Sequence, residues 1–247
     1  MRITVVGATG QVGRAVVDLL TTAGHDVVAA SRGSGADVLT GEGLDEALRG
    51  ADVLVDVVNS PSFEDEPVMA FFSAASANLV AAARKAGVGH YVALSIVGVD
   101  DLPDSGYMRA KVAQERTIAE SGLHYTIVRA TQFHEFAEMI VGSLMVGAEI
   151  HAPDARIQPI AAADVAAEVA RAAQADPADG VVDIGGPDKM SFADLARTVV
   201  AHRGETTPVV VDRAATYFGT PVDQGSLVTG DGAAISATRF SDWLAVH

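Results

Sequence analysis

A glycine-rich stretch close to the start of the sequence limits the possible folds more than any other feature. The stretch VVGATGQVG, from Val5 to Gly13, spaces three glycines evenly, directly after a short apolar run. This order predicts a strand over residues 2–6, a tight turn that needs glycine, and a helix that stops at a further glycine. The residues that mark the helix are Val12, Val16, Leu19, Leu20, Ala23 and Gly24.

The first half of the chain repeats this alternation of strand-like and helix-like segments. Further strands are predicted over residues 25–30, 52–58, 90–95 and 125–130, and helices over residues 44–48, 69–86 and 107–121. The strands are continuous runs of Val, Leu and Ile, which is typical of a parallel sheet covered on both faces. The sequence therefore predicts an α/β fold with a doubly wound, Rossmann-like parallel sheet.

The pattern loosens after about residue 150. Helices are predicted over residues 162–175 and from Ser191 onward, where Asp194 completes an approximate capping box. Strands are predicted over residues 181–184 and 209–211, and an amphipathic stretch over residues 238–246. No internal repeat or low-complexity linker divides the chain. We therefore expect a single domain over residues 1–247, in which the part from about residue 150 forms a small C-terminal substrate lobe.

Charge and composition exclude several classes of function. The chain carries 17 basic and 32 acidic residues, a net charge of −15, without a basic cluster. Since nucleic acids and anionic membranes are bound through Lys and Arg, neither is an expected partner. There is no cysteine and no histidine with a partner at ligand spacing, so no metal site is expected. No apolar run approaches the roughly 20 residues of a membrane span and no signal pattern opens the chain, which favours the cytoplasm.

The glycine turn also has a chemical interpretation. Glycines let a backbone approach a pyrophosphate closely, and the start of the following helix offers free N–H groups and a positive dipole end. The alternative is a tight turn without a ligand, but its position between a strand and a helix in a repeated pattern favours a bound dinucleotide. The contacts expected from this turn are Gly7, Thr9, Gly10, Gln11 and Val12.

The end of the second strand indicates which dinucleotide binds. NAD sites commonly place an acidic residue there, whereas this strand ends in Ser31 and Arg32 and carries Asp26 at its other end. A guanidinium pairs well with a 2′-phosphate, so the sequence favours NADP (NADPH), unless Arg32 is a solvated loop charge. Asp37 and Val38 are candidates for the adenine pocket, although Asp37 is equally interpreted as a turn residue.

Three segments together resemble a known family. They are VGATGQVG at residues 6–13, ALSIVGVD at residues 93–100 and YMRAKVAQE at residues 107–115. From residue 1 to about residue 186 the chain resembles the atypical short-chain dehydrogenases/reductases, in the NmrA-like, NAD(P)H-binding group that includes quinone reductases and triphenylmethane reductases. Members of this group are either reductases or non-catalytic redox sensors, so the resemblance leaves the activity open.

The resemblance implies catalytic roles for three residues. Tyr107 and Lys111 stand four apart and share one helix face, and Ser95 ends the preceding strand. In short-chain reductases such a lysine lowers the pKa of the tyrosine and holds the nicotinamide ribose. The tyrosine donates a proton to the carbonyl oxygen, which the serine also hydrogen-bonds.

Two further strand ends supply candidate contacts. Asn59 and Ser60 follow the third strand and are expected at the cofactor ribose. His134 is interpreted as a polar residue that starts a surface helix. In the resembling proteins the segment after the strand at residues 125–130 runs beside the nicotinamide. The contacts that this implies are Thr131 and Gln132 at the carboxamide and Phe133 at the pocket wall.

Functions from different classes remain open. The leading prediction is an NADPH-dependent reductase that transfers hydride to a small carbonyl, quinone or related acceptor, because the trio supplies a proton donor beside the nicotinamide. The alternative is a regulatory protein that senses NADP(H) and binds a protein partner without turnover. An epimerase or dehydratase is a third, weaker interpretation. Neither the acceptor nor the oligomeric state follows from the sequence.

Overall fold

A seven-stranded parallel sheet forms the centre of the computed structural model, which describes residues 1–247. The strands lie in the order β12-β9-β5-β4-β3-β1-β2, and β1 pairs in parallel with both β2 and β3. The predicted α/β fold with a Rossmann-like sheet is confirmed. The strands are β1 (Arg2–Val6), β2 (Asp26–Ala30), β3 (Val53–Asp56), β4 (His90–Ile96), β5 (Tyr125–Ala130), β9 (Gly180–Gly185) and β12 (Ala234–Ile235).

The strand order reverses at β1. After β1 the chain adds β2 on one side, then returns to place β3 on the other side and continues through β4 and β5. In open α/β sheets, ligands bind outside the carboxyl ends of the strands where the order reverses. The fold therefore points to the segments that follow β1 and β3.

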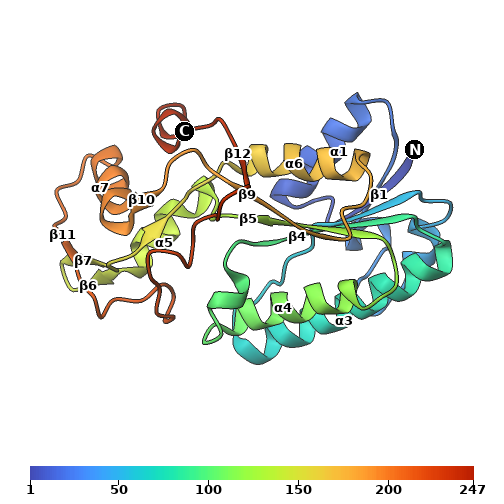
Figure 1. The fold of residues 1–247 in the computed structure, drawn as a ribbon, viewed down its shortest axis with the longest axis horizontal. Helices are drawn as coiled ribbons and strands as arrows, with labels where there is room; N and C mark the ends of the chain where they lie inside the picture. Colours follow the sequence, from blue (N-terminus) through green and yellow to red (C-terminus); the bar gives the residue numbers. More distant parts are fainter. The chain divides into compact units, whose positions relative to one another are not determined.

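Helices cover both faces of this sheet. Figure 1 shows α1 and α6 on one face and α3 and α4 on the other. Because both faces are covered, the central strand β3 is buried at every residue, and its apolar sequence follows from that burial. The helices are α1 (Gln11–Thr22), α2 (Leu44–Ala47), α3 (Asp65–Ala86), α4 (Gly106–Ala119) and α6 (Ala162–Gln174).

Helix α1 forms where the apolar spacing predicts it, but two of the residues that mark it, Leu19 and Ala23, are exposed. Val12, Val16 and Leu20 are buried, one turn apart, and Gly24 follows the helix at φ +85°, in the left-handed region that favours glycine. Leu19 is 42% exposed, because it lies at the edge of the buried stripe. The residues that mark the helix by their spacing therefore do not all face the core.

Helix α3 begins at Asp65, earlier than predicted. Asp65 and Glu66 occupy its first turn, where acidic side chains complement the positive end of the helix dipole. By length and composition α3 is the one helix that could cross a membrane, which the sequence prediction did not foresee. However, its apolar residues Phe72, Leu79 and Ala83 are fully buried within the fold, as expected for the core helix of a globular protein.

The chain divides into two compact units, and the boundaries fall near the carboxyl ends of β4, β5 and β9. The first unit consists of Met1–Ser95, Gly106–Arg129 and Val165–Val182. The second consists of Ile96–Ser105, Ala130–Asp164 and Asp183–His247. The role of the C-terminal part as a substrate lobe stays a prediction.

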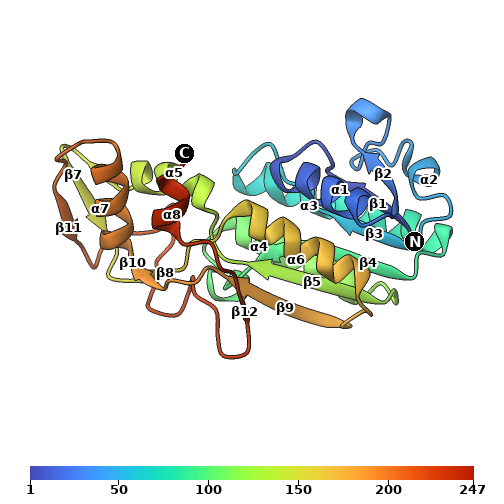
Figure 2. The same ribbon diagram turned by 90° about the horizontal axis from the view of Figure 1, so that it is seen from above.

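The second unit contains a small sheet in the order β11-β7-β6, with helix α7 beside β7 and β11 (Figure 2). Ser191 caps α7 by accepting the Asp194 N–H at 3.0 Å, which confirms the predicted helix start. The two-residue strands were not predicted, because they are too short to show a period. The elements are α5 (Ala137–Ser143), β6 (Met145–Val146), β7 (Glu149–Ala152), β8 (Arg156–Ile157), β10 (Met190–Ser191), α7 (Phe192–His202), β11 (Val209–Val211) and α8 (Phe240–Leu244).

Candidate functional site

Two of the three glycines in the turn after β1 are required by the packing of the fold itself. Gly7 has φ +86°, and a Cβ there would lie 2.8 Å from the backbone of Val57. A Cβ on Gly13 would lie 2.2 Å from the Gly7 carbonyl oxygen. Real Cβ atoms do not come this close to backbone, so any other residue at either position would force the turn apart.

Gly10 is different, because the fold constrains it less strictly than the other two glycines. Its φ of −72° suits any residue, and an added Cβ would meet only the Gly7 carbonyl oxygen, at 3.3 Å. Gly10 lies exposed at the start of α1, and no side chain caps that helix. Open space beside uncapped N–H groups suits an anion that approaches the backbone closely. The geometry of Gly10, Gln11 and Val12 therefore fits a pyrophosphate.

The end of β2 presents an unpaired guanidinium. Arg32 begins a short 3₁₀ helix (Arg32–Ser34), is exposed and forms no ion pair within the protein. Beside it, the Ser31 N–H donates to Ser34 Oγ and the Ser34 hydroxyl donates to the Ser31 carbonyl, both at 2.9 Å. This arrangement leaves Arg32 exposed without an ion pair, and its contact with a 2′-phosphate stays a prediction.

Asp37 and Val38 are engaged by their own surroundings. Asp37 Oδ1 accepts the Leu39 N–H at 2.8 Å, so the side chain closes a local turn. Val38 packs against the core, and its carbonyl accepts from Asn78 Nδ2 at 2.8 Å. The interpretation of Asp37 as a turn residue describes this geometry, and its contact with an adenine stays a prediction.

A side-chain hydrogen bond joins the segment after β3 to the start of α4. The Tyr107 hydroxyl donates to Asn59 Oδ1 at 2.7 Å, and the same oxygen accepts the Ser60 N–H at 2.9 Å. Ser60 is buried and its Oγ accepts the Ser62 N–H at 3.2 Å. Two residues that the sequence assigned separately, one to the cofactor and one to catalysis, are thus hydrogen-bonded to each other.

Tyr107 stays protonated over the physiological range. Its ring lies 5.3 Å from the ring of Phe63 and 5.9 Å from that of Phe72, measured between centroids. Burial among these groups raises the pKa of Tyr107 to about 12, since it penalises the phenolate. The expectation that a nearby lysine lowers this pKa is therefore wrong. The neutral phenol remains a hydrogen-bond donor.

Lys111 points into the protein. Its Nζ donates to the Leu94 carbonyl at 2.8 Å and to Gln114 Oε1, and it lies 4.6 Å from the ring centroid of Phe72. The side chain is 3% exposed, and this burial lowers the pKa of Lys111 to about 8. Two of its three ammonium donors are thus used inside the first unit. The expected contact of Lys111 with a ribose stays a prediction that this geometry does not favour.

Ser95 carries a hydroxyl that has no partner. It lies near the carboxyl end of β4, is 4% exposed, and its Oγ makes no hydrogen bond. Buried polar groups in folded proteins are nearly always paired, so an unpaired hydroxyl calls for an explanation. A bound substrate oxygen or cofactor group would supply the missing partner.

The segment after β5 belongs to the second unit and shows the same feature. The hydroxyl of Thr131 and both amide atoms of Gln132 are buried without partners. Phe133 stacks on Phe136, with centroids 5.5 Å apart. His134 does begin a 3₁₀ helix (His134–Phe136), but it is buried against Phe240 and is not a surface residue as expected. The distant C-terminal helix α8 covers it, which the local sequence gives no sign of.

Two buried residues beneath the site escaped the sequence analysis. Asp56 ends β3, and its Oδ2 accepts from Gln114 Nε2 on α4 at 2.9 Å. A lone carboxylate at the end of an otherwise apolar strand is a sequence signal that would have pointed to Asp56, but the prediction did not use it. Gln114 gave no signal, because its role depends on the packing of α4 against the sheet.

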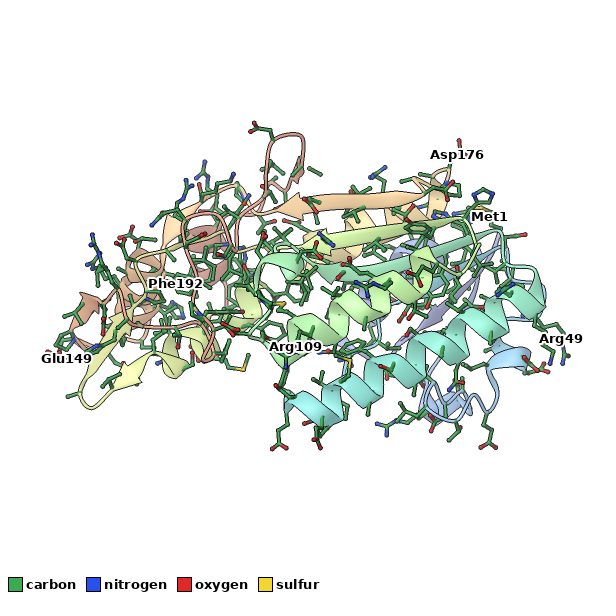
Figure 3. The ribbon with its side chains drawn as sticks, turned by 60° about the horizontal axis from the view of Figure 1, so that its bottom comes forward. Met1, Arg49, Arg109, Glu149, Asp176 and Phe192 are labelled. Carbon is green, nitrogen blue, oxygen red and sulfur yellow. The ribbon has the colours of Figure 1, made fainter.

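An ion pair joins the starts of the two helices on this face of the sheet. Arg109 Nη2 lies 2.6 Å from Asp65 Oδ2, and Figure 3 shows Arg109 near one end of its helix, in the first turn of α4. A Cβ on Gly106 would lie 2.0 Å from the same carboxylate, so the two helix ends are in close contact. This contact fixes the position of Tyr107, which follows Gly106 directly.

Comparison with known proteins agrees with this geometry. Residues 7–176, more than half of the chain, match the model of a family described as NAD(P)H-binding. A (4-alkanoyl-5-oxo-2,5-dihydrofuran-3-yl)methyl phosphate reductase from Streptomyces griseus subsp. griseus is 35% identical over 144 residues, 53% of this chain and 48% of the relative. The photosystem II assembly factor Ycf39 of Synechocystis sp. is 29% identical over 147 residues, 54% of this chain and 45% of the relative.

The chain thus spans about half the length of the curated relatives it matches. Among solved structures, an NADPH-dependent quinone oxidoreductase (QOR2) from Escherichia coli superposes with a TM-score of 0.71 over 99% of this chain and 98% of the other, at 18% identity. That similarity shows the fold. Together with the open glycine turn, the family match confirms the expected nicotinamide-dinucleotide binding. The chain belongs to the NAD(P)H-binding family.

Proposed function

We propose that this protein is an NADPH-dependent reductase of a small carbonyl, quinone or related conjugated acceptor. The observation that carries the proposal is the Tyr107 phenol, which is half-buried, protonated and paired with Asn59 next to the turn that follows β3. A neutral phenol held at the carboxyl end of the sheet suits a general acid. The nicotinamide, when bound, supplies the hydride.

The glycine turn and Arg32 account for the cofactor. The space above Gly10 and the uncapped start of α1 accommodate the pyrophosphate. The unpaired guanidinium of Arg32 favours the 2′-phosphate of NADPH, because a bidentate pair with a phosphate is strong and directional. This choice of NADPH over NADH is the finer part of the proposal.

Tyr107 and Ser95 act on the acceptor oxygen. As negative charge develops on that oxygen, the Tyr107 hydroxyl turns from Asn59 Oδ1 and transfers its proton. The unpaired Ser95 hydroxyl donates a hydrogen bond to the same oxygen, which stabilises the developing charge. The fully buried ring of Phe72 packs against one side of Tyr107 and shields that side from water, whereas Phe63 covers it only in part.

The Streptomyces relative supports a conjugated carbonyl as the acceptor. Its name describes a reductase of a dihydrofuranone that carries an alkanoyl group, a ring in which carbonyl groups are conjugated. In such a compound, hydride addition generates an enolate oxygen that a neutral phenol can protonate. We therefore extend the acceptor class to unsaturated ketones and lactones.

The alternative function is an NADP(H)-sensing protein without turnover. The similarity to Ycf39, whose name describes an assembly factor and not a reductase, favours this alternative. The inward orientation of Lys111 is compatible with it as well, since a sensor needs no lysine beside the nicotinamide. The two functions differ in whether any acceptor is reduced.

The deciding experiment measures NADPH oxidation against a panel of quinones, aldehydes, ketones and unsaturated lactones. With an accepted substrate, Tyr107→Phe should slow hydride transfer by about 10²–10⁴-fold, the usual contribution of a general acid, with NADPH affinity unchanged. Tyr125→Phe is the matched control, because Tyr125 lies at the opposite end of the sheet, at the start of β5. Tight NADPH binding without reduction of any acceptor would replace the reductase by the sensor.

A further inference from the structure

Three buried polar side chains beneath the candidate site form one connected bridge. Asp56, Lys111 and Gln114 are 1%, 3% and 2% exposed. Gln114 Oε1 accepts from the Lys111 ammonium, and Gln114 Nε2 donates to Asp56 Oδ2 at 2.9 Å. The amide is thus oriented by a cation on one side and a carboxylate on the other. We refer to these three residues as the Asp56–Lys111 bridge.

One end of the bridge sets the course of the chain after β3. Asp56 Oδ1 accepts the Val58 N–H at 3.2 Å, so the carboxylate closes a turn immediately before Asn59. Tyr91 holds the other carboxylate oxygen with a hydrogen bond of 2.9 Å from its hydroxyl. Because both carboxylate oxygens of Asp56 accept hydrogen bonds, the position of this turn is fixed. The turn also fixes the position of the Asn59 side chain.

The other end of the bridge lies one helical turn after Tyr107. The ring of Phe72 contacts both side chains, at 4.6 Å from Lys111 Nζ and 5.9 Å from the Tyr107 ring. Anchoring Lys111 on the Leu94 carbonyl of β4 therefore also fixes the rotation of α4 and the position of Tyr107. The bridge joins the two elements that supply the Asn59–Tyr107 pair.

Charge balance supports this assignment. The second acidic group near Lys111 is Glu115, which is already held by two hydrogen bonds from Arg129, at 2.9 and 2.5 Å. Asp56 is the carboxylate left to balance the buried ammonium. A buried cation that loses its counter-charge is strongly destabilised, so the three residues are expected to behave as a unit.

We propose that Asp56, Gln114 and Lys111 are positioning residues that hold Asn59 against Tyr107, and that Lys111 acts through this bridge and not by binding the cofactor. The inference rests on the proposed function, in which Tyr107 is the proton donor. Its geometric part, the coupling of the bridge to the tyrosine hydroxyl, is measurable without any turnover.

The test follows the Tyr107 hydroxyl directly, in protein labelled with ¹³C at the tyrosine Cζ. The chain has four tyrosines, so Tyr107→Phe assigns the signal, and Asn59→Ala gives the shift that follows loss of its acceptor. Lys111→Met and Gln114→Met should each move the Tyr107 signal in the same direction as Asn59→Ala. The Tyr91 signal should move as well, because its partner Asp56 is released.

Thr126→Val is the matched control for a general loss of packing. Thr126 is buried and hydrogen-bonded to His90 at 2.9 Å, at the opposite end of the sheet. This variant should be less stable but leave the Tyr107 signal in place. If Lys111→Met does not fold, Gln114→Met carries the test alone, since it keeps the Lys111 ammonium on the Leu94 carbonyl and removes the donor to Asp56.

NADPH titration of the same variants separates the two roles of Lys111. The proposal predicts that Lys111→Met and Gln114→Met lower NADPH affinity alike, by less than about threefold. A loss of about tenfold or more in Lys111→Met alone, with an unmoved Tyr107 signal, would overturn the proposal and place the ammonium at the cofactor. If the signals shift as predicted while no acceptor is reduced, the coupling of the Asp56–Lys111 bridge to Tyr107 is confirmed and the proposed reductase function is wrong.

Discussion

Buried hydroxyl groups at the two ends of β4 and β5 differ in whether they are hydrogen-bonded. At the amino ends of β4 and β5, the Thr126 hydroxyl contacts His90 Nε2 at 2.9 Å and accepts the Ala178 N–H at 3.0 Å. At the carboxyl ends, the hydroxyls of Ser95 and Thr131 are equally buried and have no partner. Along β4 and β5, the buried hydroxyl near the amino ends is thus paired and the two near the carboxyl ends are not.

This difference indicates that a ligand binds at the carboxyl ends of the strands. An unpaired buried polar group costs about 1–3 kcal/mol, so a requirement for stability alone would replace it. Gly10 is a second example of a residue that the stability of the fold does not explain. A side chain there would meet the fold less closely than at Gly7 or Gly13, and the sequence still has glycine. Positions that weaken or do not help the fold, gathered at one end of a sheet, are typical of a functional site.

The largest effect is expected from a side chain placed at Gly10, which tests whether this end of the sheet binds the cofactor. Gly10→Val should lower NADPH affinity by more than about 100-fold, because its side chain takes the place of the pyrophosphate. The melting temperature should fall by no more than about 4 °C. Fluorescence titration and circular dichroism measure the two effects.

Two other glycines serve as controls for that variant. Gly142→Val in α5 places its Cβ in open space and should change neither property. Gly13→Val should fail to fold stably, because its Cβ would meet the Gly7 carbonyl oxygen at 2.2 Å. If Gly10→Val binds NADPH as the unaltered protein does, the turn serves only the fold.

A pair of hydroxyl deletions tests the two ends against each other. Ser95→Ala should slow hydride transfer by about 10²-fold, as the loss of a donor to a developing oxyanion does, at no cost in stability. Thr126→Val should lower the free energy of unfolding by about 1–3 kcal/mol and leave the rate unchanged. Urea unfolding and stopped-flow kinetics measure them. The reverse pattern would mean that Ser95 is structural.

A smaller effect is expected at the end of β2. Arg32→Ala should weaken NADPH binding by about tenfold and leave NADH binding unchanged, because only NADPH carries the 2′-phosphate. Arg116→Ala, which removes an exposed charge elsewhere in the first unit, is the control for net charge. Equal affinity of the unaltered protein for both cofactors, measured by titration, would contradict the assignment of Arg32.

The smallest effect concerns pH and Lys111. Burial lowers the pKa of Lys111 from 10.5 to about 8. Between these values the unfolded chain keeps a proton that the folded protein has lost, so the free energy of unfolding rises with pH in this window. Below it both states hold the proton and the contribution vanishes. Relative to Lys111→Met, the protein should gain about 1 kcal/mol between about pH 8 and 9 in urea unfolding. A flat difference would show that Lys111 is not buried as a charge.

Regular elements with strong patterns were predictable from the sequence. The bounds of β1 and β5 agree with the prediction, since an uninterrupted apolar strand between turn residues has clear ends. The glycine turn was predictable as well, because strand, turn and helix are adjacent in sequence. The orientation of Arg32 toward solvent follows from its position at the end of β2.

The rest of the site depends on contacts that no local pattern records. The bond between Tyr107 and Asn59 joins two segments 48 residues apart. The inward orientation of Lys111 needs Gln114, a residue without a signal of its own, and the ring of Phe72 from another helix. A motif such as Y-x-x-x-K indicates that two side chains lie on the same face of a helix. Whether that face is directed toward the protein interior or toward a ligand depends on how the helix packs.

The loop that carries Phe63 has a consequence for how proteins of this kind diversify. Phe63 is 62% exposed and contacts the Tyr107 ring, whereas Asn59, four positions earlier, is anchored by its hydrogen bonds. Substitutions at Phe63 are expected to reshape the surface beside the Tyr107 ring and to leave the hydrogen bond between Tyr107 and Asn59 in place. Relatives that keep the pair of Tyr107 and Asn59 but differ at Phe63 are therefore expected to differ in the molecules they admit and not in the placement of this hydroxyl.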